Sequence, residues 1–306
     1  MSPRRNARAT APPARRFGGG RATSGKRRAL GQHFLRDEAV VERIVTLVRP
    51  GPEDLVVEIG PGEGALTGRL AAAAGRLIAV EVDAALAARL AARMAVSATV
   101  EIRHADALAF DWRGLPALRP APGGRVLVVG NLPYSVSKPI LMALAEAAPA
   151  LAAAARTEMA LMLQKEVAER VAAPPGDRTY GSLSVLTQCA ADVRLAFTVP
   201  PGAFRPPPLV ESAVLHLRAL AAPPVPIADP RRFRALVRAA FAQRRKSLGN
   251  AVAAGLGIPV ERARARLAAA GIDAGRRAET LTLAEFARAA DDLALSLPGR
   301  GPDERI

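Results

Sequence analysis

The chain has 306 residues, of which 50% are hydrophobic and 23% are charged, and its formal net charge is +15. This length and hydrophobic content suffice for one large domain and a smaller second one. No apolar run approaches the roughly 20 residues that span a bilayer, and a single cysteine, Cys189, excludes an intramolecular disulfide and a cysteine-based zinc site.

The chain begins with a basic segment, in which residues 1–30 contain nine arginines and lysines and no acidic residue. Residues 1–25 mix Arg, Ala, Pro and Gly without periodicity, which predicts a disordered basic tail. The tail lacks the apolar stretch of a secretory signal, and its prolines and glycines disfavour the amphipathic helix of an organellar transit peptide. We therefore expect a cytoplasmic protein, without a membrane partner.

Strands and helices are predicted to alternate from about Gly31 to residue 190. A first helix follows from apolar residues at helical spacing between Val40 and Val48, and Pro50-Gly51 ends it. Strands are then expected at 55–59, 77–82, 99–103, 126–130 and 159–163, and helices near 65–74, 84–94, 138–148, 164–173 and 181–190. This alternation predicts an α/β fold with a mostly parallel sheet covered on both faces.

The last two strands have a different connection. Residues 193–199 and 213–217 are joined only by the Pro-rich loop 200–211. A parallel crossover normally contains a helix, so we expect an antiparallel hairpin at the sheet edge. The pattern is then helical to about residue 295, which predicts a small all-α C-terminal domain. We place the domains at 26–222 and 223–297, with a tail at 298–306.

Glycines and acids follow the first three strands. Gly60-Pro61-Gly62-Glu63-Gly64 lies between the first strand and its helix, where glycine allows backbone to approach a ligand. The spacing departs from the Gly-x-Gly-x-x-Gly pattern of dinucleotide-binding folds. Glu81 ends the second strand, 21 residues after Gly60, and can accept from ribose hydroxyls, while Asp106 can accept from an adenine amino group. Taken singly, Glu81 could begin a loop and Asp106 could cap a helix.

Asn131-Leu132-Pro133-Tyr134 follows the fourth strand, at the rim where open α/β sheets bind ligands. An amino group on a flat heterocycle needs hydrogen-bond acceptors and a ring to stack on, and this tetrapeptide supplies both. In this order the glycine turn, the two acids and the tetrapeptide predict a pocket for S-adenosylmethionine.

The chain resembles the small-subunit ribosomal RNA adenine N6,N6-dimethyltransferase family from about Gly31 to about residue 290. The resemblance is carried by blocks that occur in order along the chain. These are Gly31-Gln32-His33-Phe34-Leu35, Glu58-Ile59-Gly60-Pro61-Gly62, Asn131-Leu132-Pro133-Tyr134, Leu163-Gln164-Lys165-Glu166-Val167, Tyr180-Gly181-Ser182-Leu183-Ser184-Val185, Phe204-Arg205-Pro206-Pro207-Pro208, Val210-Glu211-Ser212-Ala213-Val214 and Phe241-Ala242-Gln243-Arg244-Arg245-Lys246. The resemblance implies a Rossmann-like S-adenosylmethionine-dependent methyltransferase.

The resemblance also implies which residues contact S-adenosylmethionine. They match His33, Leu35, Gly60, Glu81, Asp106 and Asn131. Two positions depart from the family pattern. His33 stands where Asn is usual, although imidazole also forms hydrogen bonds, and Ser135-Val136 stand where Asn-Ile is usual.

The expected catalytic residues are Asn131, Leu132, Pro133, Tyr134 and Phe204. The hypothesis is that the Asn131 side-chain oxygen and the Leu132 or Pro133 carbonyl accept the two N–H bonds of the adenine amine. Its lone pair is then directed at the sulfonium methyl group. Tyr134 would stack on one base face and Phe204 on the other. Such catalysis depends on positioning and electrostatics rather than on a strong base.

Clustered cations in the C-terminal region suit phosphate contact, which sets affinity and register. The expected RNA-binding residues are Arg231, Arg232, Arg234, Arg238, Arg244, Arg245 and Lys246. A charge run is also compatible with a solvated helix face. The family resemblance favours RNA binding here.

The resemblance implies dimethylation of adenosines, two adjacent ones in a hairpin loop near the 3′ end of small-subunit rRNA, during ribosome biogenesis. The expected partner is this rRNA or the immature small subunit. We expect a monomer and, because the histidines show no ligand spacing, no metal. Two alternatives remain open: a large-subunit rRNA adenine methylase, and a non-catalytic rRNA-binding assembly factor on the same scaffold.

Overall fold

The structure is a computed structural model, and it describes residues 33–292. The predicted tails, 1–25 and 298–306, lie outside this range. Between residues 33 and 292, no helix combines the length and apolarity needed to cross a membrane.

Strands and helices alternate through the first two thirds of the chain, as predicted. The strands are β1 (Phe34–Leu35), β2 (Leu55–Ile59), β3 (Arg76–Glu81), β4 (Val100–His104), β5 (Val126–Asn131), β6 (Thr157–Gln164), β7 (Ala191–Val199), β8 (Phe204–Arg205) and β9 (Ser212–Ala219). The helices are α2 (Glu38–Val48), α3 (Thr67–Ala73), α4 (Ala84–Met94), α5 (Ser137–Ala154), α6 (Lys165–Ala172), α7 (Ser182–Gln188), α8 (Pro230–Ala242), α9 (Leu248–Leu256), α10 (Val260–Ala269) and α11 (Leu283–Asp292).

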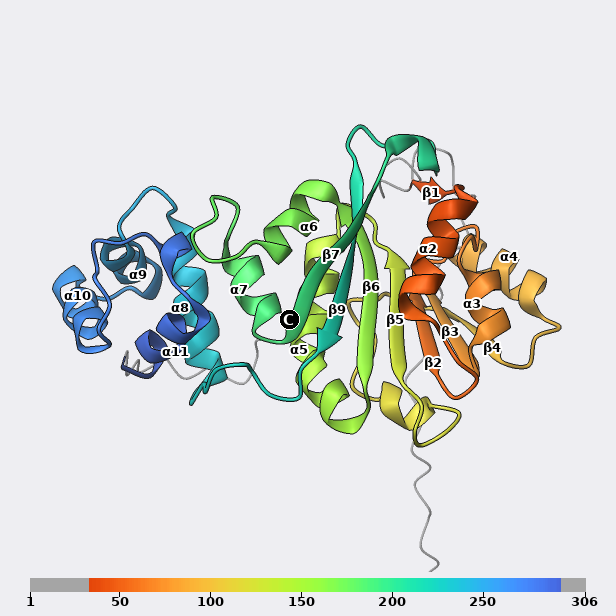
Figure 1. The fold of residues 1–306 in the computed structure, drawn as a ribbon, viewed down its shortest axis with the longest axis horizontal. Helices are drawn as coiled ribbons and strands as arrows, with labels where there is room; N and C mark the ends of the chain where they lie inside the picture. The colour runs from red at the N-terminus through yellow and green to blue at the C-terminus, as the bar shows by residue number, and fades with distance from the viewer. Residues whose placement is uncertain (1–32, 293–306) are drawn as a thin grey trace, which may run out of the picture.

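Seven strands form one sheet in the order β4-β3-β2-β5-β6-β9-β7 (Figure 1). The pairs from β4 to β6 are parallel, whereas β9 is antiparallel to both β6 and β7. The predicted α/β class and the antiparallel edge hairpin are thereby confirmed. The parallel strands end at one rim, which is where loops can build a site.

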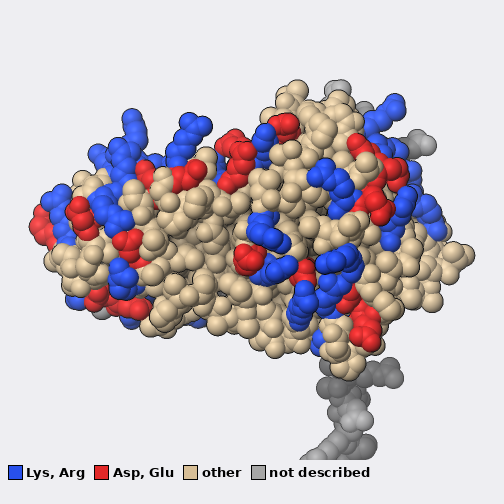
Figure 2. Space-filling model, in the orientation of Figure 1, with Lys and Arg blue, Asp and Glu red and all other residues tan. Residues whose placement is uncertain are grey.

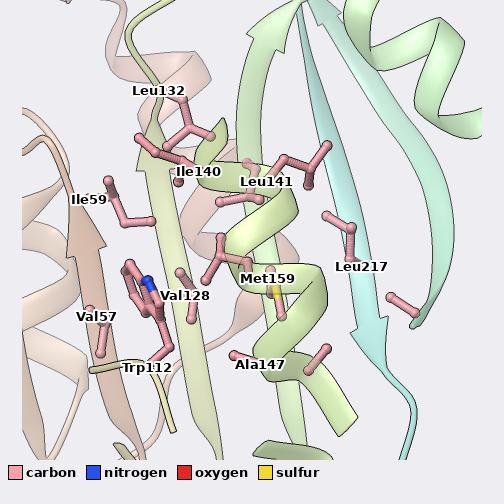
Figure 3. Packing of buried hydrophobic residues seen from close by; sticks show 14 of the residues in the cluster. Val57, Ile59, Trp112, Val128, Leu132, Ile140, Leu141, Ala147, Met159 and Leu217 are labelled. Atoms are coloured by element: carbon pink, nitrogen blue, oxygen red, sulfur yellow. The ribbon is translucent and has the colours of Figure 1, made fainter. Parts of the chain in front are cut away.

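Side-chain alternation along β6 shows how the two faces are covered. Met159 and Leu161 pack in the cluster that contains α5, whereas Ala160 and Met162 pack in the cluster that contains α2 and α3. Figure 3 shows Met159 beside Leu141 of α5, on the face that also buries Trp112. Burial on both faces explains why the central strands β2, β5 and β6 are rich in apolar residues at successive positions.

Helices α8 to α11 pack around a third cluster, which confirms the small all-α C-terminal part (Figure 1). Phe233 of α8 and Phe286 of α11 are at most 2% exposed in it. Tyr180, just before α7, and Val185 of α7 belong to the same cluster. The helical part therefore shares its core with the α7 region, while the predicted boundary at residue 222 falls between β9 and α8.

A second, two-stranded sheet was not predicted. In it β1 pairs antiparallel with β8, so that Leu35 lies opposite Phe204. The Arg36 amide extends the pairing by donating to the Ala203 carbonyl at 2.8 Å. This pairing brings the start of the described chain beside the loop that follows β7.

Candidate functional site

A pocket lies at the carboxyl ends of β2, β3 and β5, and β1 closes one side of it. Its lining residues come from four segments of the chain. They are His33, Phe34, Leu35, Glu58, Gly60, Pro61, Gly62, Glu63, Ala65, Leu66, Glu81, Asn131, Leu132, Pro133 and Tyr134. The structure thus brings together five of the six expected cofactor contacts.

The turn after β2 needs glycine. Gly60, Gly62 and Gly64 have φ angles of +62°, +56° and +78°, a region that side-chain-bearing residues rarely adopt. A Cβ at Gly62 would lie 2.9 Å from two ring carbons of Phe34. Because glycine has no side chain, β1 can pack directly on the turn and form the pocket wall.

Glu81 joins this turn to the end of β3. Its side chain is 3% exposed, and its two oxygens accept from the Gly62 and Asp83 amides, both at 3.0 Å. A carboxylate has about four acceptor positions, so these bonds leave capacity for ligand hydroxyls.

A second buried acid, Glu58, lines the pocket from inside β2. It is 1% exposed, and its Oε2 has no hydrogen-bond partner within residues 33–292. Burial raises the pKa of Glu58 to about 7; the Thr67 hydroxyl opposes this shift, and the negative charge of Glu81 adds to it. Glu58 was not among the functional residues expected from the sequence, although an acid within an apolar strand is a recognisable signal.

Asn131, at the end of β5, is oriented by a contact that the sequence does not reveal. Its Nδ2 donates to the His33 carbonyl at 2.8 Å, and His33 Nδ1 lies 2.8 Å from the Pro206 carbonyl oxygen. The amide nitrogen of Asn131 is therefore engaged, which leaves its oxygen as the acceptor available to a ligand.

Backbone hydrogen bonds after Asn131 distinguish the two candidate acceptors, the Leu132 and Pro133 carbonyls. Pro133 O already accepts from the Val136 amide at 3.1 Å, within a turn. The Leu132 carbonyl accepts no hydrogen bond from any residue that the structure describes. Leu132 therefore offers the freer acceptor, beside the Asn131 oxygen.

Tyr134 lies half-buried at the mouth of the pocket. Its hydroxyl and Ser212 Oγ are 2.6 Å apart, and its ring centroid is 5.5 Å from that of His33. Burial raises the pKa of Tyr134, and the hydrogen bond with Ser212 opposes that shift. The ring is thus held in place, as a stacking surface requires.

The chemistry of the lining favours a cationic, hydroxyl-bearing ligand. Glu58, Glu63 and Glu81 contribute carboxylates, of which Glu63 is paired with Arg36, and neither Lys nor Arg lines the pocket in the part of the chain described. A pyrophosphate would find no cationic partner here. A sulfonium cofactor that carries a ribose finds opposite charge and acceptors, so the residues present fit S-adenosylmethionine.

Two expected site residues lie outside this lining. Asp106 is exposed two residues after β4, where its Oδ1 accepts from the Leu108 amide at 2.9 Å. Phe204 is 4% exposed and packs in the cluster with Leu35 and Val40. Stacking of a base on Phe204 would therefore require its ring to leave this cluster.

The expected RNA-binding cations occupy several environments. Arg238 and Arg244 line a cleft between α5, α7 and α8, together with Lys138 and Arg170. Arg231, Arg234 and Arg238 follow helical spacing on α8, whereas Arg232 pairs with Asp229 at 3.2 Å. Arg244, Arg245 and Lys246 lie in the turn after α8 and are exposed.

Lys138 was not singled out from the sequence, yet it is the second residue of α5, four positions after Tyr134. Its place in the cleft connects the tetrapeptide region with the cations of α8. For metals, the described residues hold no group of three or more His, Cys, Asp or Glu side chains suited to an ion.

Comparison with known proteins shows the family of this chain. A family model described as ribosomal RNA adenine dimethylase matches residues 23–295. Ribosomal RNA small subunit methyltransferase A of Geobacter sulfurreducens is 45% identical over 262 residues, which cover 85% of this chain and 92% of that protein. The protein of that name from Xanthomonas campestris pv. campestris (strain B100) is 44% identical, covering 87% and 95%.

Solved structures give the same fold. A dimethyladenosine transferase from Plasmodium falciparum superposes with a TM-score of 0.68 at 22% identity, covering 84% of this chain and 96% of that one. The 23S rRNA methyltransferase ErmE gives 0.61 at 26% identity, covering 85% and 99%. On the match of its whole described length, this chain belongs to the ribosomal RNA adenine dimethylase family.

Proposed function

We propose that this chain is an enzyme that transfers methyl groups from S-adenosylmethionine to N6 of adenosines in small-subunit ribosomal RNA, giving N6,N6-dimethyladenosine. Relatives about 45% identical carry the small-subunit name, whereas the large-subunit enzyme is 26% identical. The observation that carries the proposal is a pair of free acceptors, Asn131 Oδ1 and the Leu132 carbonyl, at the rim of a pocket lined with carboxylates.

Each of the pocket residues would make a different contact with the cofactor. Glu81 accepts from the ribose hydroxyls, the turn at Gly60 and Gly62 lets the backbone approach, and Leu35 supplies apolar contact. Asp106 takes the adenine amino group, from its position after β4. When bound, S-adenosylmethionine supplies an electrophilic methyl group on a positively charged sulfur, and Glu58 and Glu81 give that charge a favourable surrounding.

The adenine amine is a weak nucleophile because its lone pair is delocalised into the ring. Acceptance of its two N–H bonds by Asn131 Oδ1 and Leu132 O favours a pyramidal nitrogen with a directed lone pair. Tyr134 stacks on the base and Pro133 stiffens the loop, so less order has to be imposed on binding. The methylated amine is cationic and releases its proton readily, so a strong base is unnecessary.

The proposal also covers the RNA partner, the cellular location and the oligomeric state. The cleft of Lys138, Arg238 and Arg244 supports phosphate contact next to the tetrapeptide. We assign the target to two adjacent adenosines in a hairpin loop near the 3′ end of the rRNA. We further propose a cytoplasmic monomer, with catalysis in residues 26–222 and RNA contact in residues 223–297.

One experiment tests this function directly. The protein is incubated with undermethylated small subunits, undermethylated large subunits and labelled S-adenosylmethionine, and modified positions are mapped by primer extension. We expect N6,N6-dimethyladenosine in the small subunit alone. Label in the large subunit would instead support a large-subunit rRNA adenine methylase. Cofactor binding too weak to detect by isothermal titration would support a non-catalytic assembly factor.

A further inference from the structure

A basic hollow lies away from the pocket, on the α2 face of the sheet. Its volume is about 820 Å³, and it is bounded by one side of α2, the starts of β5 and β6, β7 and the end of β9. Six arginines line it: Arg43, Arg49, Arg125, Arg156, Arg194 and Arg218. Figure 2 shows the corresponding concentration of blue side chains around a depression on the front of the molecule.

The hollow exists because α2 covers only part of this face. In β6 the side chain of Glu158 points to the same side as Ala160 and Met162, which α2 covers. Around Glu158 and His216 the sheet continues to β7, where Leu195 is 37% exposed. The sheet face beyond α2 is therefore open.

The negative charges at the hollow are already paired. Glu158 is 4% exposed and lies 2.8 Å from Arg156 and 3.0 Å from His216, and Glu42 lies 3.1 Å from Arg69. Arg125 is held by Asp54 at 2.6 Å. These pairs hold the floor of the hollow in place and neutralise its acids. The net positive charge of the hollow therefore comes from the remaining arginines.

Four arginines around the hollow have no ion pair with any residue in 33–292. Arg43, Arg49, Arg194 and Arg218 are exposed, and each donates to no carboxylate there. Arg43 lies over the Phe197 ring, 3.8 Å from its centroid, which orders its guanidinium. Exposed guanidiniums without carboxylate partners, one of them ordered by a ring, favour phosphate recognition.

The arrangement suits a chain of phosphates better than a single one. No glycine turn lines the hollow within the described residues, and the helix end that faces it is the C-terminal end of α2, capped at Arg49. That end carries partial negative charge, which disfavours a compact dianion. The free cations are distributed over α2, β7 and β9 rather than converging on one point.

We propose that this hollow binds the phosphate backbone of a second segment of the ribosomal RNA partner. It lies on the α2 face, whereas the cleft of Lys138 and Arg238 lies beside α5 and α7. Arg156, just before β6, lies six residues from Met162, which pairs with Asn131, so the Arg156 end of the hollow lies on the order of 20 Å from Asn131. Helices α2 and α5 cover opposite faces of the sheet, so the hollow and the cleft would contact different segments of the RNA.

The proposal takes its partner from the proposed function, but its test is independent of methyl transfer. Binding of full-length protein to undermethylated small subunits is measured over a series of salt concentrations, for the wild type and for the double variant R194E/R218E. We expect at least tenfold weaker binding and a salt slope reduced by about two. The neutral pair R194Q/R218Q should give a smaller loss in the same direction.

A matched pair, R89E/R113E, provides the control, since both arginines are exposed and lie outside the hollow. It carries the same charge change and should bind nearly as the wild type does. Equal binding by R194E/R218E and wild type, or equal weakening in the two pairs, would overturn the proposal. Isothermal titration with S-adenosylmethionine should be unchanged throughout, which separates this outcome from failure of the proposed function.

Discussion

The Asn131 side-chain nitrogen donates to the main-chain carbonyl of His33 at 2.8 Å, across 98 residues of sequence. This bond fixes which end of the amide is presented to a substrate. The contact uses the backbone of residue 33, which any residue supplies, so it does not depend on the His33 side chain.

Asn131→Ala removes one of the two acceptors that we propose for the adenine amine. We expect the rate of methyl transfer to fall about 10²–10³-fold, the range found when one preorganised polar contact is removed from a transition state. Single-turnover methylation of undermethylated small subunits measures the rate, and isothermal titration measures cofactor affinity, which should change little. Ser135→Ala, an exposed neighbour, is the control. Near-normal turnover in Asn131→Ala would exclude the proposed role.

Tyr134 offers a ring and a hydroxyl whose contributions can be separated. Tyr134→Ala should weaken productive RNA binding by about 5- to 150-fold, since stacking on one base contributes roughly 1–3 kcal/mol. Tyr134→Phe keeps the ring and loses only the bond with Ser212, so its loss should stay within a few fold. The concentration dependence of single-turnover rates provides the measurement. Equal defects in both variants would contradict a stacking role.

Gly62→Ala introduces a Cβ where the backbone has φ +56° and where Phe34 carbons lie 2.9 Å away. We expect the turn and β1 to shift, with a loss of cofactor affinity of about tenfold or more, measured by isothermal titration. Gly68→Ala is the matched control, because α3 leaves open space around that position. It should leave affinity unchanged and raise stability by up to about 1 kcal/mol.

Glu58 makes stability depend on pH. Folding raises its pKa from 4.5 to about 7, so the folded state binds this proton more tightly than the unfolded state. The resulting stabilisation is fully present below pH 4.5 and is lost as the pH rises through 7, by an amount on the order of 3 kcal/mol.

Glu58→Gln should abolish that dependence and leave the protein more stable than the wild type at pH 8. Urea unfolding of both proteins between pH 5 and 8 tests this expectation. Glu63→Gln, which alters a partly exposed carboxylate of the same pocket, should retain the wild-type slope. A wild-type slope in Glu58→Gln would show that another group titrates.

The central strands of the large sheet were predictable because they are buried on both faces. Leu55–Ile59 is apolar except for Glu58, and Val126–Asn131 is apolar up to Gly130, and turn residues bound both segments, so the sequence pattern indicates their positions. The antiparallel hairpin followed from a connection without a helix. Helix α5 runs to Ala154, past the predicted end at residue 148, because Ala148 and Leu151 are buried on both sides of Pro149.

The small sheet was not predictable, since two-residue strands such as β1 and β8 have no periodicity. Contacts between residues far apart in the sequence, such as His33 with Pro206 and Tyr134 with Ser212, also leave no local pattern from which they could be predicted. The position of Phe204 illustrates a further limit. Its motif marks it as a base-stacking candidate, whereas only three-dimensional packing reveals that its ring is enclosed beside Leu35.

The pairing of β1 with β8 has a practical corollary for recombinant work. A fragment starting at Asp37 would retain every strand of the large sheet, and its circular dichroism would look native. It would nevertheless lack the wall against which Gly62 packs and the carbonyl that orients Asn131. Affinity tags and fusion partners therefore belong upstream of His33, and a well-folded truncation is no guarantee of a competent catalyst.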